Sequence, residues 1–345
     1  MSLSMAAGKG AKDPRLGKRI ITLSAALAAL CAFAAAGVAL GSIDIKLSEI
    51  LRAVFDHADP ENLRENFRII YYIRLPRVLT AVMVGVNMAL AGCIMQGVLR
   101  NPLADPGIIG VSAGAGMTAV AVMVLFPEYS LLIPPIAFLG ALAATGIVFL
   151  LSWENGIQPL RMILAGVAVS AFFGAIMSAI MVFNSDKIQG TVNWMAGGFH
   201  GRSWEHVKMI FPYCLFGTVS VLCGYRYLNA LQLGDEVAKS IGARVELSRF
   251  LLVALSALLA ASAVSVAGMI GFVGLIVPHT MRIFVGSDFE FLLSCSALFG
   301  GALVVGADTV ARTIIAPIEI PVGIFMALLG APFFLYLLKK GMSRG

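Results

Sequence analysis

Long uncharged apolar runs recur along almost the whole chain, and they constrain its fold more than any other feature. The first, residues 20–40, holds 21 residues without a charge, whereas a helix needs about 20 to cross a bilayer. This run is also longer than the apolar part of a typical signal peptide. Further runs of similar kind lie at 78–98, 108–126, 131–151, 162–183, 209–224, 250–267, 269–285, 291–311 and 321–338. We therefore expect an all-α membrane protein, with about ten transmembrane helices in one compact bundle.

The composition excludes the other broad classes of protein. Hydrophobic residues make up 59% of the chain and charged residues only 13%, against about 25% charged residues in soluble domains. The same figures exclude a disordered chain. Although the net charge is +6, the basic residues are scattered among apolar runs and form no stripe that would bind nucleic acid.

The loops predict an orientation and a simple division of the chain. If the N-terminus is cytoplasmic, most of the 25 Lys and Arg residues fall on the inside, as the positive-inside rule requires. We expect a basic cytoplasmic tail at 1–19, a transmembrane domain at 20–340 and a short tail at 341–345, with both termini cytoplasmic.

Three longer polar segments exceed what is needed to join helices. Residues 43–77 are expected outside, with an amphipathic helix at 48–55. Residues 184–206, also outside, predict a short surface helix or a partly re-entrant segment. Residues 225–249 lie inside and predict two short helices broken at Gly242.

Small residues and helix breaks mark places of close contact. Small residues recur at every fourth position of the second run, which places a smooth stripe on one helix face and favours close helix packing. They are Ala81, Gly85, Ala89, Cys93 and Gly97. Glycine and proline interrupt the chain at 100–107 and 268–279, and broken helices of this kind often line a pathway in transporters.

No enzyme signature is present in the sequence. The segment from Gly234 to Ser240 resembles a phosphate-binding loop, but Ala238 stands where the second glycine is required. The apolar runs hold no paired acid and base and no cluster of metal-ligating side chains. We therefore expect no catalytic residue, no metal site and no cofactor bound by this chain, and a membrane enzyme is disfavoured.

A few polar residues lie within or beside the apolar runs and leave one alternative open. Because Arg312 follows Asp308 by four residues, the two are expected to pair. A secondary transporter driven by an ion gradient would instead need carboxylates inside the membrane. Asp308 and Glu319 are the only candidate pair for such a site.

Several separate motifs resemble one family over roughly residues 47–340. They are Arg74-Leu-Pro-Arg77, Arg100-Asn-Pro-Leu-Ala-Asp-Pro106, Leu233-Gly-Asp-Glu-Val-Ala-Lys-Ser-Ile-Gly242, Gly271-Phe-Val-Gly-Leu-Ile-Val-Pro-His279 and Ala307-Asp-Thr-Val-Ala-Arg312. In this order they resemble the permeases of ABC importers for iron chelates, haem and cobalamin.

The resemblance implies a multi-pass subunit of the bacterial cytoplasmic (inner) membrane. Such a permease pairs with a second copy or a paralogue and forms the translocation path at the dimer axis. Two cytoplasmic ATPase subunits, which bind ATP and magnesium, and an external solute-binding protein complete the importer. A ferric siderophore is the first substrate class to expect, with haem, cobalamin and oxyanions left open.

The resemblance also implies roles for particular residues. Outer arginines that meet carboxylates of the binding protein would be Arg74, Arg77 and Arg312. The inner gate would be Asn101, Pro102 and Leu103, and an outer constriction would include Asn184 and Ser185. The segment that docks on the ATPase, within the loop 225–249, would include Leu233, Gly234, Asp235, Glu236, Ala238, Lys239 and Gly242.

Overall fold

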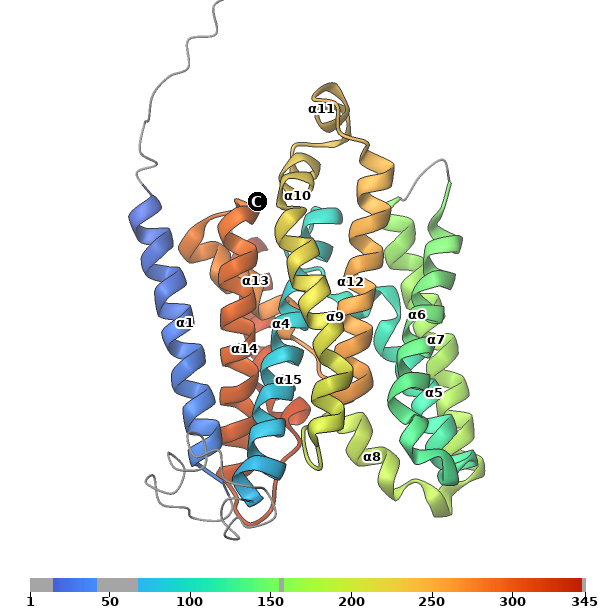
Figure 1. Cartoon of the computed structure of the whole chain (residues 1–345). Coiled ribbons are helices and arrows are strands. Elements are labelled where there is room, and N and C mark those ends of the chain that lie inside the picture. Colours follow the sequence, from blue (N-terminus) through green and yellow to red (C-terminus); the bar gives the residue numbers. More distant parts are fainter. Residues whose placement is uncertain (1–14, 42–67, 155–157, 343–345) are drawn as a thin grey trace, which may run out of the picture.

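The computed structural model describes residues 15–41, 68–154 and 158–342 and shows a helical bundle (Figure 1). The expectation of an all-α protein is confirmed for these residues. The α-helices are α1 (Leu16–Ala39), α4 (Leu75–Val98), α5 (Val111–Leu125), α6 (Ile133–Ser152), α7 (Pro159–Phe183), α8 (Gln189–Ala196), α9 (Trp204–Cys223), α10 (Tyr225–Gln232), α11 (Asp235–Ser240), α12 (Val245–Ala267), α13 (Val273–Val285), α14 (Phe289–Thr313) and α15 (Val322–Met342). Short helices of other types are η2 (Ile70–Arg74), η3 (Pro106–Ile109), η4 (Pro127–Leu132) and η5 (Ser185–Lys187).

The predicted apolar runs all fold as helices, but not all are long. Within the described residues, seven helices are long and apolar enough to cross a membrane, and three apolar helices are shorter. Each of the ten predicted runs overlaps with one of these helices. The predicted run 269–285 begins too early, because Gly268 has a φ of +72° and Phe272 one of +68°, which ends α12 and delays α13 until Val273.

The two ends of the bundle differ. The start of α1, helices α10 and α11 and the C-terminus lie at one end, whereas α8 and the connection from α14 to α15 lie at the other (Figure 1). We call these the inner and outer ends, after the orientation that the loop charges predict. Basic Lys18 and Arg19 begin α1 at the inner end, in keeping with that orientation.

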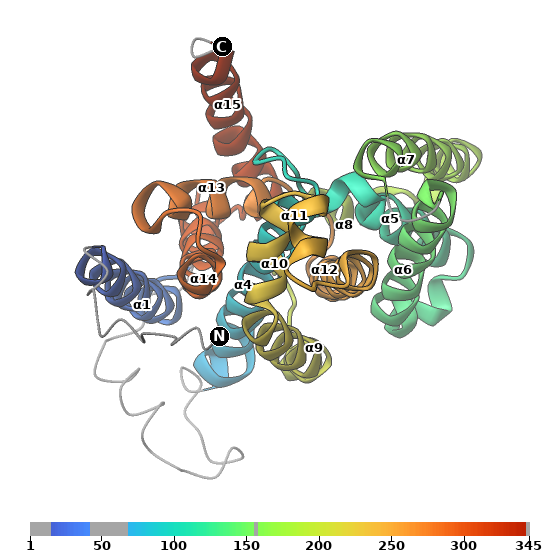
Figure 2. The same ribbon diagram turned by 90° about the horizontal axis from the view of Figure 1, so that it is seen from above.

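Helices α4 and α12 are mostly buried, whereas only 11%, 17% and 22% of the apolar stretches of α1, α7 and α9 are buried inside the bundle. Seen from above, α4 and α12 lie in the middle, α5 to α7 on one side and α1 on the other (Figure 2). Exposed apolar helix surface is expected in a bilayer, since lipid is as apolar as leucine.

The small-residue stripe of α4 packs closely, as expected. A Cβ on Gly85 would collide with the carbonyl of Gly300 in α14. On another face of α4, a Cβ on Gly92 would collide with the carbonyl of Gly274 in α13. The backbones of three helices can therefore approach closely only because glycine occupies these contacts.

Short helices lie in both the inner and the outer loop segments, with one difference from the predicted break. The two short helices of the inner loop are separated at Gly234, which has a φ of +99°, and not at Gly242, which follows α11 with a φ of +87°. Both conformations suit glycine. The outer segment does contain a short helix, α8, while the predicted amphipathic helix at 48–55 lies outside the described residues.

Candidate functional site

A buried ion cluster lies beneath the outer surface, at the start of α4. The guanidinium of Arg77 donates two hydrogen bonds to Asp308 of α14, both 2.8 Å long. Its third donor lies 2.7 Å from a carboxylate oxygen of Glu319, which precedes α15. Arg77 and Asp308 are 7% and 2% exposed, so this pair holds α4 to α14 within the bundle.

Arg312 does not pair with Asp308 in the way that the sequence spacing suggested. It donates to the carbonyl of Gly37 near the end of α1. Arg74 donates to the carbonyls of Val38 and Ala39, at 2.9 and 2.7 Å. The last carbonyls of a helix lack partners within the helix, so two arginines from distant segments cap α1.

All three predicted docking arginines are therefore buried and hydrogen-bonded within the chain. Arg312 lies within electrostatic range of the other two and of both carboxylates, so three guanidiniums and two carboxylates share one region. Contact between these arginines and a binding protein stays a prediction. The partly exposed member of the cluster is Glu319, whose side chain is 25% exposed.

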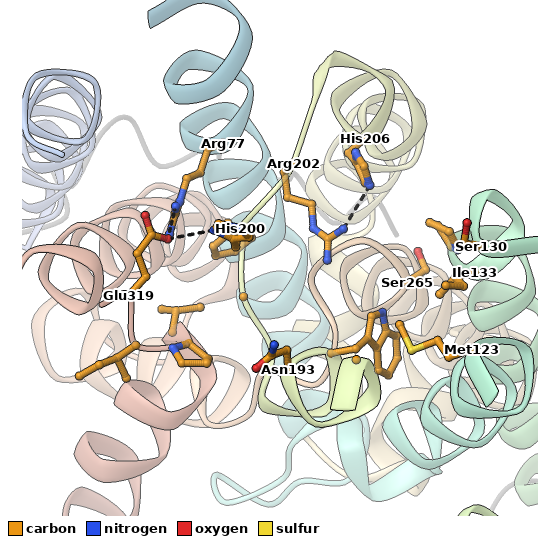
Figure 3. A pocket seen from close by; sticks show the side chains of 18 of the residues that line it. Arg77, Met123, Ser130, Ile133, Asn193, His200, Arg202, His206, Ser265 and Glu319 are labelled. Carbon is orange, nitrogen blue, oxygen red and sulfur yellow. Dashed lines mark hydrogen bonds and ion pairs between the residues drawn. The ribbon is translucent and has the colours of Figure 1, made fainter. Parts of the chain in front are cut away.

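Glu319 stays ionised in this setting. Burial alone would raise the pKa of this carboxyl, but the hydrogen bond and charge of Arg77, together with nearby His200, hold the pKa of Glu319 below its usual range. The Nδ1 atom of His200 lies 3.4 Å from the same carboxylate. The cluster thus reaches the surface as a carboxylate with a histidine beside it (Figure 3).

The cluster forms one wall of a cavity of about 700 Å³ at the outer end. The segment from α8 to the start of α9 and the segment before α15 line most of it, and the ends of α5 and α6 complete it (Figure 3). Polar and aromatic side chains face it, including Ser130, Asn193, Trp194, Arg202, His206 and Ser265. The sequence analysis did not single out Arg202, because no motif surrounds it.

The predicted outer constriction lies beside this cavity without lining it. The amide of Asn184 donates to the carbonyl of Ile180, 2.9 Å away, and so caps the end of α7. Ser185 follows in η5 and is exposed. A gating role for these two residues stays a prediction.

At the inner end, one carboxylate joins three segments. Asp235 begins α11 and accepts hydrogen bonds from Arg249 of α12, at 2.8 Å, and from Arg100 after α4, at 3.1 Å. The sequence analysis missed both arginines, because their nearness to Asp235 depends on how the helices pack. The predicted ATPase-docking segment is thereby tied to the two central helices.

The same inner segment presents apolar side chains at the end of the bundle. Leu233, Val237 and Ile241 are 59%, 46% and 62% exposed, whereas Ala238 is buried. Glu236 and Lys239 are also exposed. An apolar patch rimmed by charges is typical of a surface that binds another protein.

The predicted inner gate is a tight turn next to this segment. The side chain of Asn101 accepts from the backbone N–H of Leu103 at 2.9 Å, and Pro102 is exposed. Asp105 accepts from the N–H of Gly107 at 2.8 Å and begins η3. Burial raises the pKa of the Asp105 carboxyl, so a half-buried acidic group lies just beyond the turn.

The alternative of an ion-coupled site is weakened by this geometry. The two carboxylates that it requires, Asp308 and Glu319, both bind Arg77. A cation in that position would have to displace a guanidinium that already compensates both charges. Among the described residues, no group of three or more His, Cys, Asp and Glu side chains could hold a metal ion.

A multi-span helical bundle with an ion cluster beside a cavity at one end and an exposed apolar patch rimmed by charges at the other is the architecture expected of a membrane transport subunit. The model of the FecCD transport family matches residues 27–340, and the chain belongs to this family. It is an ABC transporter permease, and the predicted resemblance is confirmed.

Named relatives agree with this assignment. A cobalamin import system permease protein from Halobacterium salinarum is 44% identical over 272 residues, which cover 79% of this chain and 73% of that protein. An Fe(3+)-citrate import system permease protein from Bacillus subtilis is 40% identical over 272 residues, covering 79% and 82%. Permease proteins for haemin and for iron–hydroxamate complexes are also among the relatives.

A solved structure supports the fold. A metal-chelate type ABC transporter in an inward-facing conformation superimposes with a TM-score of 0.82 at 32% identity. The match covers 93% of this chain and 99% of that one. The relatives are permease proteins and not enzymes, in agreement with the expectation from the sequence.

Proposed function

We propose that this chain is the permease subunit of an ATP-driven importer in the bacterial inner membrane and that, with a second copy, it forms the path for a ferric siderophore. Two ATPase subunits, which bind ATP and magnesium, would dock on α10 and α11, and a binding protein would deliver the chelate at the outer end. The observation that carries this proposal is the tie through Asp235, because it joins the exposed inner segment to two central helices.

A continuous set of contacts leads from that tie to the outer end. Arg249 lies on α12, and the last residue of that helix, Ala267, accepts from the N–H of Gly198 at 2.8 Å. The carbonyl of Gly197 in turn accepts from the N–H of Gly323 in α15 at 3.0 Å. A displacement of α11 would therefore tilt α12 and move segments that line the outer cavity.

The turn at Asn101 to Leu103 would serve as the inner gate. The turn directly follows Arg100, which donates a hydrogen bond to Asp235. A movement of Asp235 would therefore pull on the residue that precedes the turn. The outer constriction at Asn184 and Ser185 directly precedes α8, which lines the cavity. Both gates would respond to the same displacement of the inner segment.

The substrate class rests on chemistry and on the relatives together. The outer cavity of about 700 Å³ is large for a bare ion and combines polar with apolar walls, as suits a bulky chelate. Haem and cobalamin are the alternative cargoes, since permeases for both are relatives. Oxyanions remain a further option.

Reconstitution tests the proposal. The permease would be purified from its native membrane with its bound partners, which mass spectrometry would identify, and the complex would be placed in liposomes. We expect an ATPase with Walker motifs and uptake of ⁵⁵Fe-siderophore that requires ATP inside and binding protein outside. Uptake by the permease alone, driven by an ion gradient and stopped by Asp308→Asn, would replace the proposal with a secondary transporter.

A further inference from the structure

Among the residues that the structure describes, the outer cavity holds a guanidinium that no acidic side chain compensates. Within the described part of the chain, Arg202 forms no ion pair, and its Nε atom is buried without a hydrogen-bond partner. The Nη1 atom of Arg202 lies 3.2 Å from the Nε2 atom of His206. Ser203 in turn lies within hydrogen-bonding distance of His206 Nδ1, so the imidazole is fixed and orients the guanidinium.

The neighbouring charges do not neutralise Arg202. Glu319, the carboxylate that lines the same cavity, is bound to Arg77 at 2.7 Å. Asp308 is bound to Arg77 as well and lies deeper. Glu205, the nearest acidic residue in the sequence, is exposed and does not line the cavity. Counting residues 15–41, 68–154 and 158–342, one positive charge is therefore left over in the cavity.

Keeping this charge buried is costly. Burial lowers the pKa of Arg202 to about 10, because part of this half-buried side chain, including its Nε atom, has lost contact with water. Buried cations are normally paired. An unpaired one that faces an open cavity is explained most simply by a partner that arrives from outside the chain.

The surroundings of Arg202 supply further hydrogen-bonding groups. Figure 3 shows its guanidinium pointing into the cavity, with Asn193 below it and Ser265 to its right in this view. The indole of Trp194 and the hydroxyl of Ser130 line the same space. A planar guanidinium can bind both oxygens of a carboxylate at once, while amide and hydroxyl groups bind the remaining lone pairs.

We propose that the outer cavity is an anion subsite in which Arg202 binds a carboxylate of the chelate as it enters the path. Anionic chelates that carry carboxylates would pass this site more readily than neutral ones. The nature of the cargo rests on the proposed function, but the anion site itself does not. A carboxylate of the binding protein is a less suitable occupant, because Arg202 lies within the cavity while His200, 89% exposed, occupies its rim.

Quenching of Trp194 fluorescence tests the site without any partner protein. The purified permease would be placed in lipid nanodiscs with Trp153→Phe and Trp204→Phe, so that Trp194 is the only indole left. Iodide probes anion access, and acrylamide, which is neutral, probes access alone. The quenching constant for iodide divided by that for acrylamide then reports the charge of the cavity.

We expect Arg202→Gln to lower this ratio about two-fold or more, and Arg202→Lys to preserve it. The control is Lys187→Gln, which removes an exposed cation in η5 that does not line the cavity, and the ratio should not change. Citrate should protect Trp194 from iodide in the parent protein and not in Arg202→Gln. Equal ratios in parent and Arg202→Gln, or no protection by citrate, would overturn the site.

Trp204 donates a hydrogen bond to the carbonyl of Tyr71, which Trp204→Phe removes. The measurements are therefore repeated in a protein that carries Trp153→Phe but retains Trp204. A further measurement distinguishes a carboxylate of the chelate from one of the binding protein. The affinity of the binding protein for the permease should be equal in the parent and in Arg202→Gln. A ten-fold loss of this affinity would assign the site to the binding protein. If citrate protection holds while ATP-driven uptake fails, the anion site stands and the proposed function falls.

Discussion

At the scale of single residues, Arg77 decides how the outer end is held together. Its planar fork satisfies both oxygens of Asp308 and one of Glu319, which lysine could not do in the same geometry. Breaking a buried pair leaves an uncompensated charge, which costs more than the pair itself contributes. Loss of one member of the cluster is therefore expected to destabilise the fold.

Asp308→Asn is expected to lower the free energy of unfolding by about 3–5 kcal/mol, because it leaves Arg77 partly unpaired in a buried site. Thermal unfolding in detergent measures the loss. The double variant Arg77→Met with Asp308→Leu removes both charges and should recover most of it. A double variant no more stable than Asp308→Asn would show that the pair does not act as a unit.

The lowered pKa of Glu319 predicts a pH dependence of stability. A carboxyl whose pKa is lower in the folded state adds stability that is fully present above its ordinary pKa of about 4.5. This stability is lost as the pH falls through the folded value. Melting temperatures of the parent protein and Glu319→Gln should therefore differ at pH 6 and converge towards pH 3. A constant difference across this range would contradict the prediction.

At the scale of helices, two features determine how the bundle packs and moves. Glycine contacts let α4 approach α13 and α14, where there is no room for a Cβ. At the inner end, Asp235 links α11 to α12 and to the turn after α4. Packing in a membrane depends on such close contacts, because burial of apolar surface gives no advantage over lipid.

Gly92→Ala should destabilise the protein by about 1–3 kcal/mol, the usual cost of adding a methyl group to a packed contact. A Cβ at that position would meet the backbone of Gly274, which cannot rotate away. Gly146→Ala in α6 is the matched control, since nothing lies within 4 Å of its position. Equal melting temperatures for the two variants would refute the packing argument.

Asp235→Asn should uncouple ATP hydrolysis from transport in the reconstituted importer. We expect uptake to fall about ten-fold while ATP hydrolysis continues, because the link from α11 to Arg249 and Arg100 loses its charge. Glu290→Gln, an exposed residue also at the inner end, is the control and should transport normally. Tightly coupled uptake by Asp235→Asn would remove α11 from the proposed mechanism.

At the scale of the whole molecule, helices α15 and α7 expose large apolar side chains. Helix α15 projects from the bundle at the top of Figure 2, and α7 lies to the right along the same upper edge. Leu328 and Leu335 of α15 and Phe172 of α7 are each more than 60% exposed. Apolar surface of this kind contacts either lipid or another subunit, and the proposed function assigns it to the second permease.

Cysteine cross-linking can distinguish these two cases. In a variant without native cysteines, Leu328→Cys should form a cross-linked dimer in native membranes. Leu27→Cys in α1, 50% exposed and on the other side of the bundle, should stay monomeric under the same conditions. A dimer from Leu27→Cys and none from Leu328→Cys would place the second subunit elsewhere.

The class of fold could be predicted from the amino-acid sequence, because transmembrane helices follow from local runs of apolar residues and loop positions follow from glycine, proline and charge. The motifs likewise identified the family, since each is a short stretch of adjacent residues. Which side chains meet became clear only from the packing of the helices. Arg77 binds Asp308 across 231 positions, and Arg312, although only four positions from Asp308, donates to α1 instead. Such pairings depend on the packing of helices that are distant in the chain, which no local pattern contains.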